Sequence, residues 1–299
     1  KNKNCKIEFI YHINSVTNKN FISNLFKKNK INVVFHAAAY KHVNMMEINP
    51  KSAVYNNILG TKIVVDNSIK FKVEKFILIS TDKAVNPTNV MGASKRICEL
   101  YLSFNLNDKK HNTSLISTRF GNVLGSNGSV VPIFEKQIKS GGPIKITHPD
   151  IVRYFMTIPE AAQLVLQATS LSVGGEVFLL DMGAPVRILD LARKLIYLNS
   201  LTEKTLDNPD GDIEIKIKGL RPGEKLFEEM LISADSKPTA HPLIYKAEED
   251  HLKAEYLWNK LDIMKSFIDR RDTDNALKTL NEIIPEWNRY TKLIINSEI

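Results

Sequence analysis

Several common sequence features are absent, and each absence narrows the class of protein. The 299 residues contain only two cysteines, Cys5 and Cys98, and neither lies at ligand spacing from another Cys or His. A disulfide framework is therefore excluded, and a reducing compartment is the expected environment. The sequence also has no signal peptide and no apolar run of the roughly 18 residues that a membrane-spanning helix requires.

The glycine-rich turn that usually opens a dinucleotide-binding sheet is also missing. Its pattern, G-x-G-x-x-G, lets the backbone approach a pyrophosphate at the start of a helix, and it occurs nowhere in the chain. Residues 121–128 (GNVLGSNG) are rich in glycine but follow a late predicted strand. The chain begins at Lys1 rather than at Met. We therefore expect the first βαβ unit to lie upstream, and the alternative is that the protein binds no dinucleotide.

Acidic residues are fewer than basic ones. The chain has 41 Lys and Arg against 33 Asp and Glu, which gives a net charge of +8. The basic residues are scattered, and no stretch interleaves them with aromatic residues as nucleic-acid-binding segments do. We therefore expect no nucleic acid as a partner and relate part of the excess to a pocket for an anionic ligand.

Short apolar runs alternate with helical periodicity over most of the chain. Strands are predicted at residues 7–11, 32–39, 75–80, 113–119 and 177–181, and helices at residues 19–30, 50–72, 89–106 and 159–168. This alternation is typical of βαβ units around a parallel sheet that is buried on both faces. We expect an α/β fold with a Rossmann-like, doubly wound parallel sheet, which lacks its first βαβ unit in this chain. Ligands bind at the carboxyl ends of such strands.

The later part of the chain is less regular. Residues 212–218 (DIEIKIK) alternate strictly and predict a half-buried strand, and residues 188–198 predict an amphipathic helix. From about Glu248 the tail predicts further amphipathic helices. We expect residues 1–182 to form the sheet domain, and residues 183–299 to form a smaller C-terminal α/β region with a helical tail.

Residues that can carry chemistry follow the predicted strand at residues 75–80. Thr81, Asp82 and Lys83 come directly after it, and Met91 and Lys95 lie on the next predicted helix. Positions i and i+4 share one helix face, so Met91 and Lys95 are expected to face the same strand end. An isolated Asp-Lys pair is usually a surface turn, but at the end of a buried strand it predicts an acid–base pair.

This arrangement resembles the extended short-chain dehydrogenases, which carry a Ser or Thr at this strand end and a Tyr-x-x-x-Lys on the next helix. Here Met91 takes the tyrosine position. The string STDKAVNPTNVMGASKR at residues 80–96 closely resembles the UDP-N-acetylglucosamine 4,6-dehydratases of bacterial polysaccharide and glycan biosynthesis, the CapD-like group. In that group the membrane-attached, C5-retaining branch carries Met at this position, and the smaller C5-inverting branch carries Tyr. The resemblance therefore implies the retaining branch.

Further motifs of the same group follow in order between about Asn32 and about His241. They are HAAAYKH at residues 36–42, NILGT at 57–61, RFGN at 119–122, a stretch ending in THPD at 142–150, RYFM at 153–156 and RPGE at 221–224. One departure is that Asn14 and Ser15 stand where the family has a Gly-Asp or Gly-Ser pair that contacts adenine. We expect Ser15 to take that role.

The resemblance implies a dehydration across C5 and C6 of the sugar, with NAD as the cofactor. Asp82 is then the acid at O6, and Lys83 is the base at C5. A lysine base must be neutral, so we expect burial or the charge of Lys95 to lower the pKa of Lys83. A thioether cannot transfer a proton, so the O4 base is not Met91. We expect Thr81 to relay that proton, with aspartate assistance as the alternative.

The resemblance also implies which residues bind the ligands. Residues 1–182 become the NAD-binding domain, with segments 122–152 reaching the substrate, and residues 183–299 become the substrate-binding region. The expected cofactor-binding residues are Ser15, Ala37, Ala38, Ala39, Lys41, Asn57, Ser80 and Lys95. The expected residues for the UDP-sugar substrate are Lys41, His42, Asn122, Arg153, Arg221 and Glu224. No metal is expected, because no carboxylate or Cys clusters with His36 or His42 at ligand spacing.

Two other functions stay open at this point. A nucleotide-sugar 4-epimerase or a C5-inverting dehydratase would use a closely related scaffold, and an epimerase has no use for Asp82 and Lys83 as an acid–base pair. A catalytically silent nucleotide-sugar-binding domain would fit the missing fingerprint and the replaced tyrosine. The resemblance further implies a homo-oligomer in the cytoplasm, or at the cytoplasmic face of the inner membrane if an upstream segment attaches it there.

Overall fold

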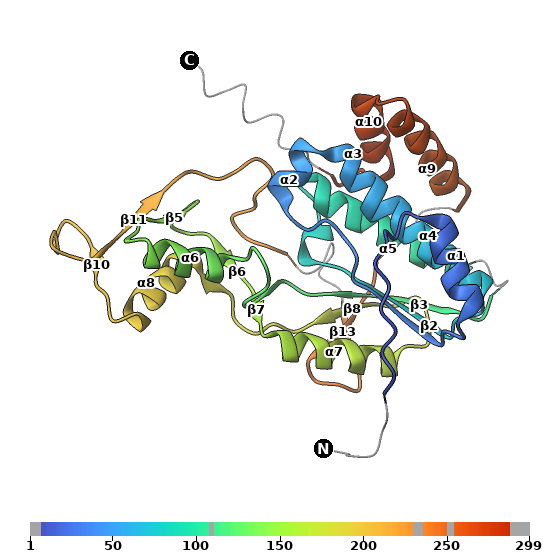
Figure 1. Cartoon of the computed structure of the whole chain (residues 1–299), viewed down its shortest axis with the longest axis horizontal. Coiled ribbons are helices and arrows are strands. Elements are labelled where there is room, and N and C mark those ends of the chain that lie inside the picture. Colours follow the sequence, from blue (N-terminus) through green and yellow to red (C-terminus); the bar gives the residue numbers. More distant parts are fainter. Residues whose placement is uncertain (1–6, 108–110, 230–235, 250–253, 288–299) are drawn as a thin grey trace.

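A six-stranded sheet forms the centre of the molecule (Figure 1). The computed structural model describes residues 7–107, 111–229, 236–249 and 254–287. The strand order is β1-β2-β3-β8-β13-β12, and the first four strands are parallel. In chain order the strands are β1 (Val33–His36), β2 (Lys75–Ile79), β3 (Ser114–Arg119), β8 (Val177–Leu180), β12 (Ser236–Pro238) and β13 (Ile244–Ala247). The expected Rossmann-like parallel α/β fold is confirmed.

Helices cover both faces of this sheet, which explains why its strands are apolar on both sides. One face is covered by α1 (Lys19–Lys28), α3 (Pro50–Ala53), a π-helical turn η1 (Val54–Leu59), α4 (Gly60–Lys70) and α5 (Val90–Asn107). The other face is covered by α7 (Ile158–Leu171). Within β2 the side chains alternate, since Phe76 and Leu78 join the first core and Ile77 joins the second.

The predicted helical tail consists of two helices, α9 (Ala254–Asp269) and α10 (Thr273–Ile283). They pack on each other and on the layer formed by α3, η1 and α5, as the upper part of Figure 1 shows. Leu257, Leu261 and Trp287 are buried in the same core as α5. Trp258 packs against the same core, so both tryptophans hold the tail to the main body.

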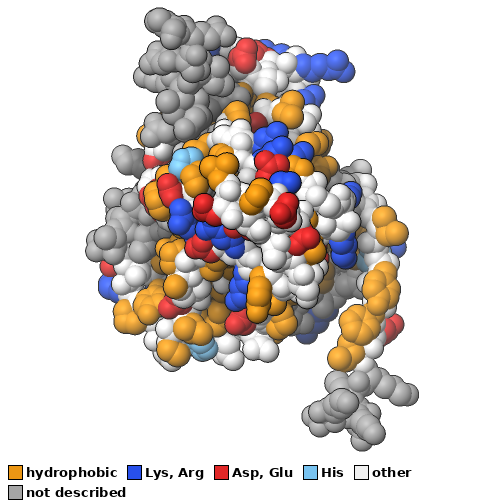
Figure 2. All heavy atoms as spheres, turned by 90° about the vertical axis from the view of Figure 1, so that its left-hand side faces the viewer, with side chains coloured by type: hydrophobic (Ala, Val, Ile, Leu, Met, Phe, Trp, Pro, Cys, Tyr) orange, Lys and Arg blue, Asp and Glu red, His pale blue; other side chains and the backbone are white. Residues whose placement is uncertain are grey.

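The predicted strand at residues 7–11 is wrong. These residues belong to no sheet of the described chain, and Phe9 and Tyr11 are 68% and 84% exposed. Figure 2 shows hydrophobic side chains along a segment that projects from the body of the molecule. An apolar, β-prone run becomes a strand only where a partner strand supplies hydrogen bonds, and among the described residues this run has none.

A smaller region lies beyond the carboxyl ends of the parallel strands. Its sheet has the order β10-β11-β5, formed by β10 (Glu203–Lys204), β11 (Ile213–Ile217) and β5 (Ile144–Ile146). Its helices are α6 (Val130–Lys139) and α8 (Ile188–Leu198), and their apolar sides enclose a separate core. The alternating strand predicted at residues 212–218 is confirmed as β11.

Two short strand pairs connect the smaller region to the main sheet. β4 (Asn122–Val123) pairs with β7 (Phe155–Met156), and β6 (Val152–Arg153) pairs with β9 (Val186–Arg187). The expected division between residues 1–182 and 183–299 stays a prediction. In the structure, β12 and β13 of the later part join the main sheet, and β5 of the earlier part joins the smaller sheet. No helix of the described residues is long and apolar enough to cross a membrane.

Candidate active site

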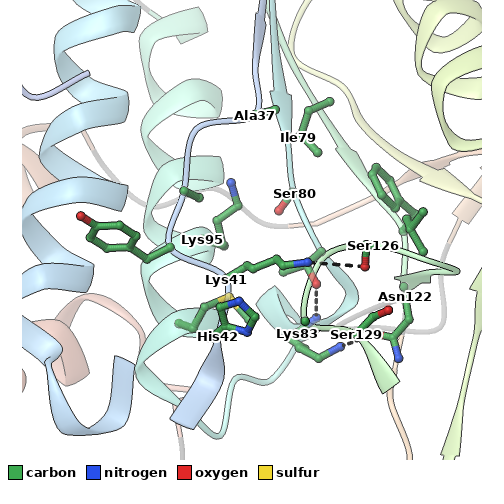
Figure 3. A pocket seen from close by; sticks show the side chains of 18 of the residues that line it. Ala37, Lys41, His42, Ile79, Ser80, Lys83, Lys95, Asn122, Ser126 and Ser129 are labelled. Carbon is green, nitrogen blue, oxygen red and sulfur yellow. Dashed lines mark hydrogen bonds between the residues drawn. The ribbon is translucent and has the colours of Figure 1, made fainter. Parts of the chain in front are cut away.

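A pocket of about 380 Å³ opens at the carboxyl ends of β1 and β2 (Figure 3). It lies where a parallel α/β sheet is expected to bind its ligand. Ten of the residues singled out in the sequence line it: Ala37, Ala39, Lys41, His42, Ser80, Thr81, Lys83, Met91, Lys95 and Asn122. These residues come from four separate segments of the chain, so the fold brings the predicted site together.

Met91 and Lys95 lie at the start of α5 and face the pocket from one helix side. Both side chains are buried. Burial lowers the pKa of the Lys95 amine, and the charge of Glu99 opposes this only in part. The helix starts where it does because the Asn89 side chain accepts a hydrogen bond from the backbone N–H of Gly92 at 2.8 Å. The tyrosine position of the resembling dehydrogenases is thus occupied by a buried thioether.

Thr81, Asp82 and Lys83 form a hydrogen-bonded turn directly after β2, with η2 (Asp82–Ala84) as a single 3₁₀ turn. The Thr81 hydroxyl donates to Oδ1 of Asp82 at 2.8 Å, and the amine of Lys83 donates to the same oxygen at 2.9 Å. The Asp82 side chain is fully buried, and that of Lys83 is 18% exposed. The surface-turn interpretation of this pair is therefore wrong.

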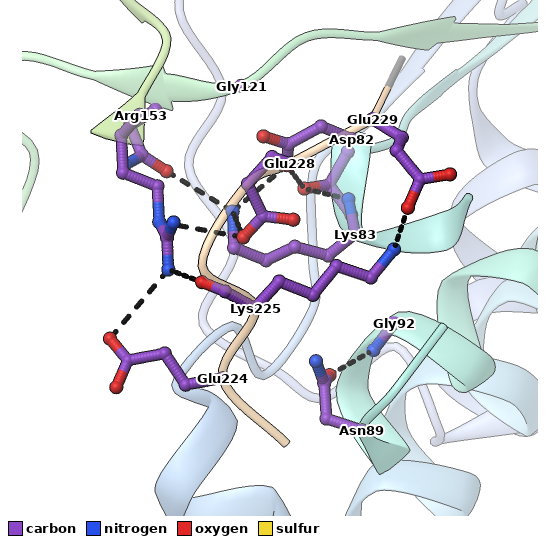
Figure 4. Close-up of polar contacts among 12 residues, drawn as sticks. Asp82, Lys83, Asn89, Gly92, Gly121, Arg153, Glu224, Lys225, Glu228 and Glu229 are labelled. Carbon is purple, nitrogen blue, oxygen red and sulfur yellow. Dashed lines mark hydrogen bonds and ion pairs between the residues drawn. The ribbon is translucent and has the colours of Figure 1, made fainter. Parts of the chain in front are cut away.

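The expected lowering of the Lys83 pKa is also wrong. Burial lowers the pKa of this amine, but the negative charges of Asp82 and Glu228 outweigh burial and leave the pKa above its ordinary value. Arg153 acts in the lowering direction with a smaller effect. The amine of Lys83 lies 3.5 Å from Oε1 of Glu228 (Figure 4). Glu228 lies outside every motif singled out in the sequence, and nothing in its local pattern distinguishes it from the exposed Glu229 beside it.

Three glycines allow the close approaches that build the site. A Cβ on Gly92 would lie 2.1 Å from the carbonyl oxygen of Lys83, and one on Gly121 would lie 3.0 Å from Oδ2 of Asp82. Gly128 has a φ of +69°, and a Cβ there would lie 2.7 Å from the His42 ring. Gly121 and Gly128 thus let the backbone approach Asp82 and His42 closely.

The remaining cofactor candidates occupy different places. Asn57 is buried behind the pocket, where its side chain bonds to both backbone groups of Tyr40 and to Ser94, so it fixes the loop that carries Ala37 and Ala39. Ala38 is not among the lining residues. Ser15 is exposed before α1, and the pocket does not include it. Ser80 lines the pocket and donates to Glu99 at 2.6 Å.

A second pocket of about 230 Å³ adjoins the first and shares Asn122, Gly128 and Val130 with it. Arg153, Arg221 and Glu224 line this second pocket, so the expected substrate residues lie together. Arg153 is buried and donates to the carbonyl oxygens of Val152, Lys225 and Leu226, which fixes its guanidinium. Arg153 is therefore fixed inside the fold rather than at its surface.

His36 lies next to the site and is buried. Its ring nitrogen Nε2 is 2.9 Å from the Thr61 hydroxyl. Burial, with a contribution from Lys95, lowers the pKa of His36 to about 3. No group of three or more His, Cys, Asp or Glu residues that could hold a metal occurs in the described part of the chain.

Comparisons with known proteins agree with this geometry. A family profile described as "Polysaccharide biosynthesis protein" matches residues 1–249. The Staphylococcus aureus capsular polysaccharide biosynthesis protein CapD is 49% identical over 92% of this chain and 44% of its own length. The chain thus spans less than half of that relative. A Campylobacter jejuni protein named UDP-N-acetylglucosamine 4,6-dehydratase (inverting) is 33% identical over 91% of this chain and 73% of its own.

Other relatives and a solved structure match this chain at 34–38% sequence identity. Rickettsia proteins named UDP-glucose 4-epimerase are 36–38% identical over 69% of this chain and 57% of theirs. The crystal structure of Pen from Bacillus thuringiensis superposes with a TM-score of 0.70 and 34% identity. The superposition covers 79% of this chain and 70% of Pen. Pen therefore shares the fold of most of this chain at 34% sequence identity.

Proposed function

The chain belongs to the polysaccharide biosynthesis protein family, and from this premise we propose that it carries out the NAD-dependent 4,6-dehydration of a UDP-N-acetylhexosamine. The expected substrate is UDP-N-acetylglucosamine, and the product is the 4-keto-6-deoxy sugar with the C5 configuration retained. One observation carries the proposal: Asp82 and Lys83 form a buried acid–base pair whose amine reaches the pocket that Met91 and Lys95 line. An epimerase has no use for such a pair.

The pocket has the features that a dinucleotide cofactor needs at this place. Ala37 and Ala39 are small residues that leave space after β1, and Lys95 supplies a buried cation beside Ser80 and Thr81. Ala37, Ala39 and Lys95 would hold the nicotinamide half of NAD, with Asn57 fixing the loop from behind. When bound, NAD supplies an acceptor for hydride from C4 and returns it at C6. The chain's own residues then transfer the protons and orient the substrate.

The proton chemistry follows from the contact between Lys83 and Asp82. Dehydration requires a neutral amine to take the C5 proton and a carboxylic acid to protonate the departing O6. Loss of the Lys83 proton to solvent gives the neutral amine, and the proton that O4 loses on oxidation gives the carboxylic acid when it reaches Asp82, whose Oδ1 lies 2.9 Å from Nζ of Lys83. The 4-ketone makes the C5 proton acidic, and the electron pair of the C5–H bond forms the C5=C6 bond as O6 leaves as water. Lys83 returns a proton to C5 as C6 is reduced, so the pair ends the cycle as it began.

The O4 proton needs a different acceptor, because Met91 has none. Thr81 lines the pocket, and its hydroxyl donates to Asp82 at 2.8 Å. A proton accepted by this hydroxyl can pass along the hydrogen bond to the carboxylate. This contact supports Thr81 as the relay. It also leads the proton to Asp82, so the expected alternative, aspartate assistance, is part of the same path.

The second pocket supports binding of the UDP part of the substrate. Arg221 and Glu224 line it, and the Glu224 carboxylate accepts from the backbone N–H of Arg221 at 3.1 Å. A guanidinium suits phosphate oxygens, and a carboxylate suits ribose hydroxyls. Asn122 lies at the junction of the two pockets, where the sugar must pass from one to the other. The homo-oligomer and the cytoplasmic or membrane-face location stay predictions.

Substitution of the acid–base pair tests the proposal directly. Asp82→Asn and Lys83→Met are each expected to lower turnover of UDP-N-acetylglucosamine by about 100-fold or more, because each removes a proton-transfer group. Turnover is measured as the appearance of the 4-keto-6-deoxy product. Lys216→Met, at an exposed lysine of β11, is the matched control and should keep wild-type turnover. Near-wild-type rates in both Asp82→Asn and Lys83→Met would contradict the proposal.

Three outcomes would favour the other functions. The epimerase alternative is supported by the Rickettsia relatives, and a C4 epimer as product would establish it. The C5-inverting alternative is supported by the Campylobacter relative, and a product inverted at C5 would establish it. Binding of the UDP-sugar without any product would favour the silent binding domain.

A further inference from the structure

Glu228 is a buried carboxylate that the proposed reaction does not yet use. Its side chain is 3% exposed and lies between two cations. One oxygen, Oε1, is 3.5 Å from Nζ of Lys83 and 3.5 Å from Nε of Arg153 (Figure 4). The other oxygen, Oε2, is buried and has no hydrogen-bond partner among the residues that the structure describes. Burying a carboxylate is costly unless nearby charge compensates, so its position between the two cations is its main support.

The amine of Lys83 is surrounded by three oxygen atoms from three elements. Asp82 Oδ1 in η2 lies at 2.9 Å, Asn122 Oδ1 in β4 at 3.3 Å, and Glu228 Oε1 in the segment after Arg221–Glu224 at 3.5 Å. Arg153 is the further charged group beside Glu228, and its own second acidic neighbour is Glu224, at 3.7 Å. The amine of Lys225 points elsewhere, to Glu229 and to the carbonyl oxygen of Val85. Glu228 is thus the acidic group of the smaller region that contacts the Lys83 amine.

We propose that Glu228 is a positioning residue that holds Lys83 as a cation in the substrate-free site and sets the pH at which its amine can accept the C5 proton. This rests on the proposed dehydration. Before the reaction, the proton lies on Lys83 beside the Asp82 and Glu228 carboxylates. Loss of that proton to solvent creates the neutral amine that can accept the C5 proton, and no other bond changes. The charge of Glu228 favours the state before this loss, because an anion at this distance stabilises an ammonium.

Competitive acetylation of the intact chain over a range of pH tests this inference without turnover. Mass spectrometry of the peptides gives the pH midpoint of acetylation for each lysine. Glu228→Gln keeps the shape of the side chain and removes its charge, so the midpoint of Lys83 is expected to fall by about one pH unit or more. The matched control is Glu229→Gln, which removes the same charge from a side chain that is 48% exposed and pairs with Lys225. It should leave the midpoint of Lys83 unchanged.

The wild-type chain provides a second test that needs no variant to fold. The Lys83 midpoint is expected above that of an exposed lysine such as Lys216, because two carboxylates face its amine. A wild-type midpoint below that of Lys216 would overturn the proposal, and so would a Glu228→Gln midpoint equal to wild type. Product analysis decides the proposed function separately, since labelling needs no catalysis. Where dehydration occurs, the rising limb of the Glu228→Gln pH–rate profile should move to lower pH by the same amount.

Discussion

At the residue scale, the site depends on one carboxylate oxygen that serves two neighbours. Oδ1 of Asp82 accepts from the Thr81 hydroxyl and from the Lys83 amine, while Oδ2 is buried with no hydrogen-bond partner among the described residues. A buried carboxylate oxygen without a donor is unfavourable in the substrate-free site and becomes satisfied when it is protonated or meets a hydroxyl. This is the behaviour expected of an acid that serves a sugar hydroxyl.

The hydroxyl of Thr81 is expected to carry the O4 proton. Thr81→Val keeps the side-chain shape but removes the hydroxyl, and turnover should fall by about 100-fold or more. Thr81→Ser retains the hydroxyl and should restore most of the activity. Steady-state kinetics with UDP-N-acetylglucosamine measures both. Near-normal turnover of Thr81→Val would remove Thr81 from the mechanism.

His36 gives the fold a pH dependence whose sign can be worked out. The pKa of His36 is about 3 in the folded protein, against 6.5 ordinarily. Below pH 6.5 the unfolded chain binds a proton that the folded chain excludes, so the free energy of unfolding should fall as the pH drops. The loss approaches about 1.4 kcal/mol per pH unit until the folded pKa is reached.

Urea unfolding at pH 7.5, 6 and 5 (roughly spaced across this window) measures the effect. His36→Gln should unfold with a free energy that varies less with pH than that of the wild type. His12→Gln changes an exposed histidine and serves as the control. Equal pH dependence in wild type and His36→Gln would contradict the assignment.

The sequence predicted most residues of the site but not their charge states. Thr81, Lys83, Met91 and Lys95 were found because they follow a strand or share a helix face, which are local properties. The raised pKa of Lys83 depends on Glu228, which is separated from it by 145 positions, 228 minus 83. No local pattern reports such a contact. The adenine contact expected of Ser15 stays a prediction, since Ser15 does not line the pocket.

At the element scale, the junction between η2 and α5 positions both halves of the chemistry. The strand end carries Asp82 and Lys83, and the helix start carries Met91 and Lys95. The backbone of Gly92 lies against the carbonyl group of Lys83, so the two elements are in direct contact. Any change that separates them should move the amine of Lys83 away from the pocket.

Gly92→Ala tests this contact. The added Cβ would lie 2.1 Å from a backbone oxygen, so the junction must shift, and the free energy of unfolding should fall by about 1–3 kcal/mol. Gly60→Ala is the matched control within α4, because its Cβ would meet the end of the Val16 side chain at 2.9 Å, which can move. Helix propensity favours alanine there by about 1 kcal/mol. Equal losses in both variants, measured by urea unfolding, would contradict the account of the junction.

Element types followed well from the sequence where periodicity was strong. The runs that became β2, α5 and β11 were predicted within a few residues, because a continuous apolar run, a helical periodicity and a strict alternation are each recognisable in the sequence. The run at residues 7–11 failed because a strand needs a partner, and the sequence pattern contains only one side of that pair. The strands β12 and β13 were not predicted, since both are short and mixed in polarity.

At the scale of the whole molecule, a buried charge cluster connects the site to the segment that follows β13. Glu99 of α5 accepts hydrogen bonds from Ser80 and from Arg119, the last residue of β3. Arg119 also pairs with Glu249, which follows β13, and Glu249 pairs with Arg96 of α5. The strand end that carries Thr81 is therefore held by segments far apart in the sequence, which no local pattern could have predicted.

The smaller region completes the site from the opposite side. Arg153 and Glu228 come from its connecting segments. Glu228 contacts the amine of Lys83 in η2, and Arg153 contacts Glu228 (Figure 4). Asn122 lies between the two pockets and accepts from the Lys83 amine at 3.3 Å. Both parts of the chain are therefore needed for the acid–base pair, and dehydration should depend on the two together.

The product formed in D2O shows directly whether the chain removes the C5 proton of its substrate. With NAD and UDP-N-acetylglucosamine, we expect a 4-keto-6-deoxy sugar with deuterium at C5 and the C5 configuration retained, as read by NMR. The deuterium arises because the base removes the C5 proton and the solvent-exchanged group returns another. A C4 epimer without deuterium at C5 would contradict the dehydration, and deuterium at an inverted C5 would contradict retention.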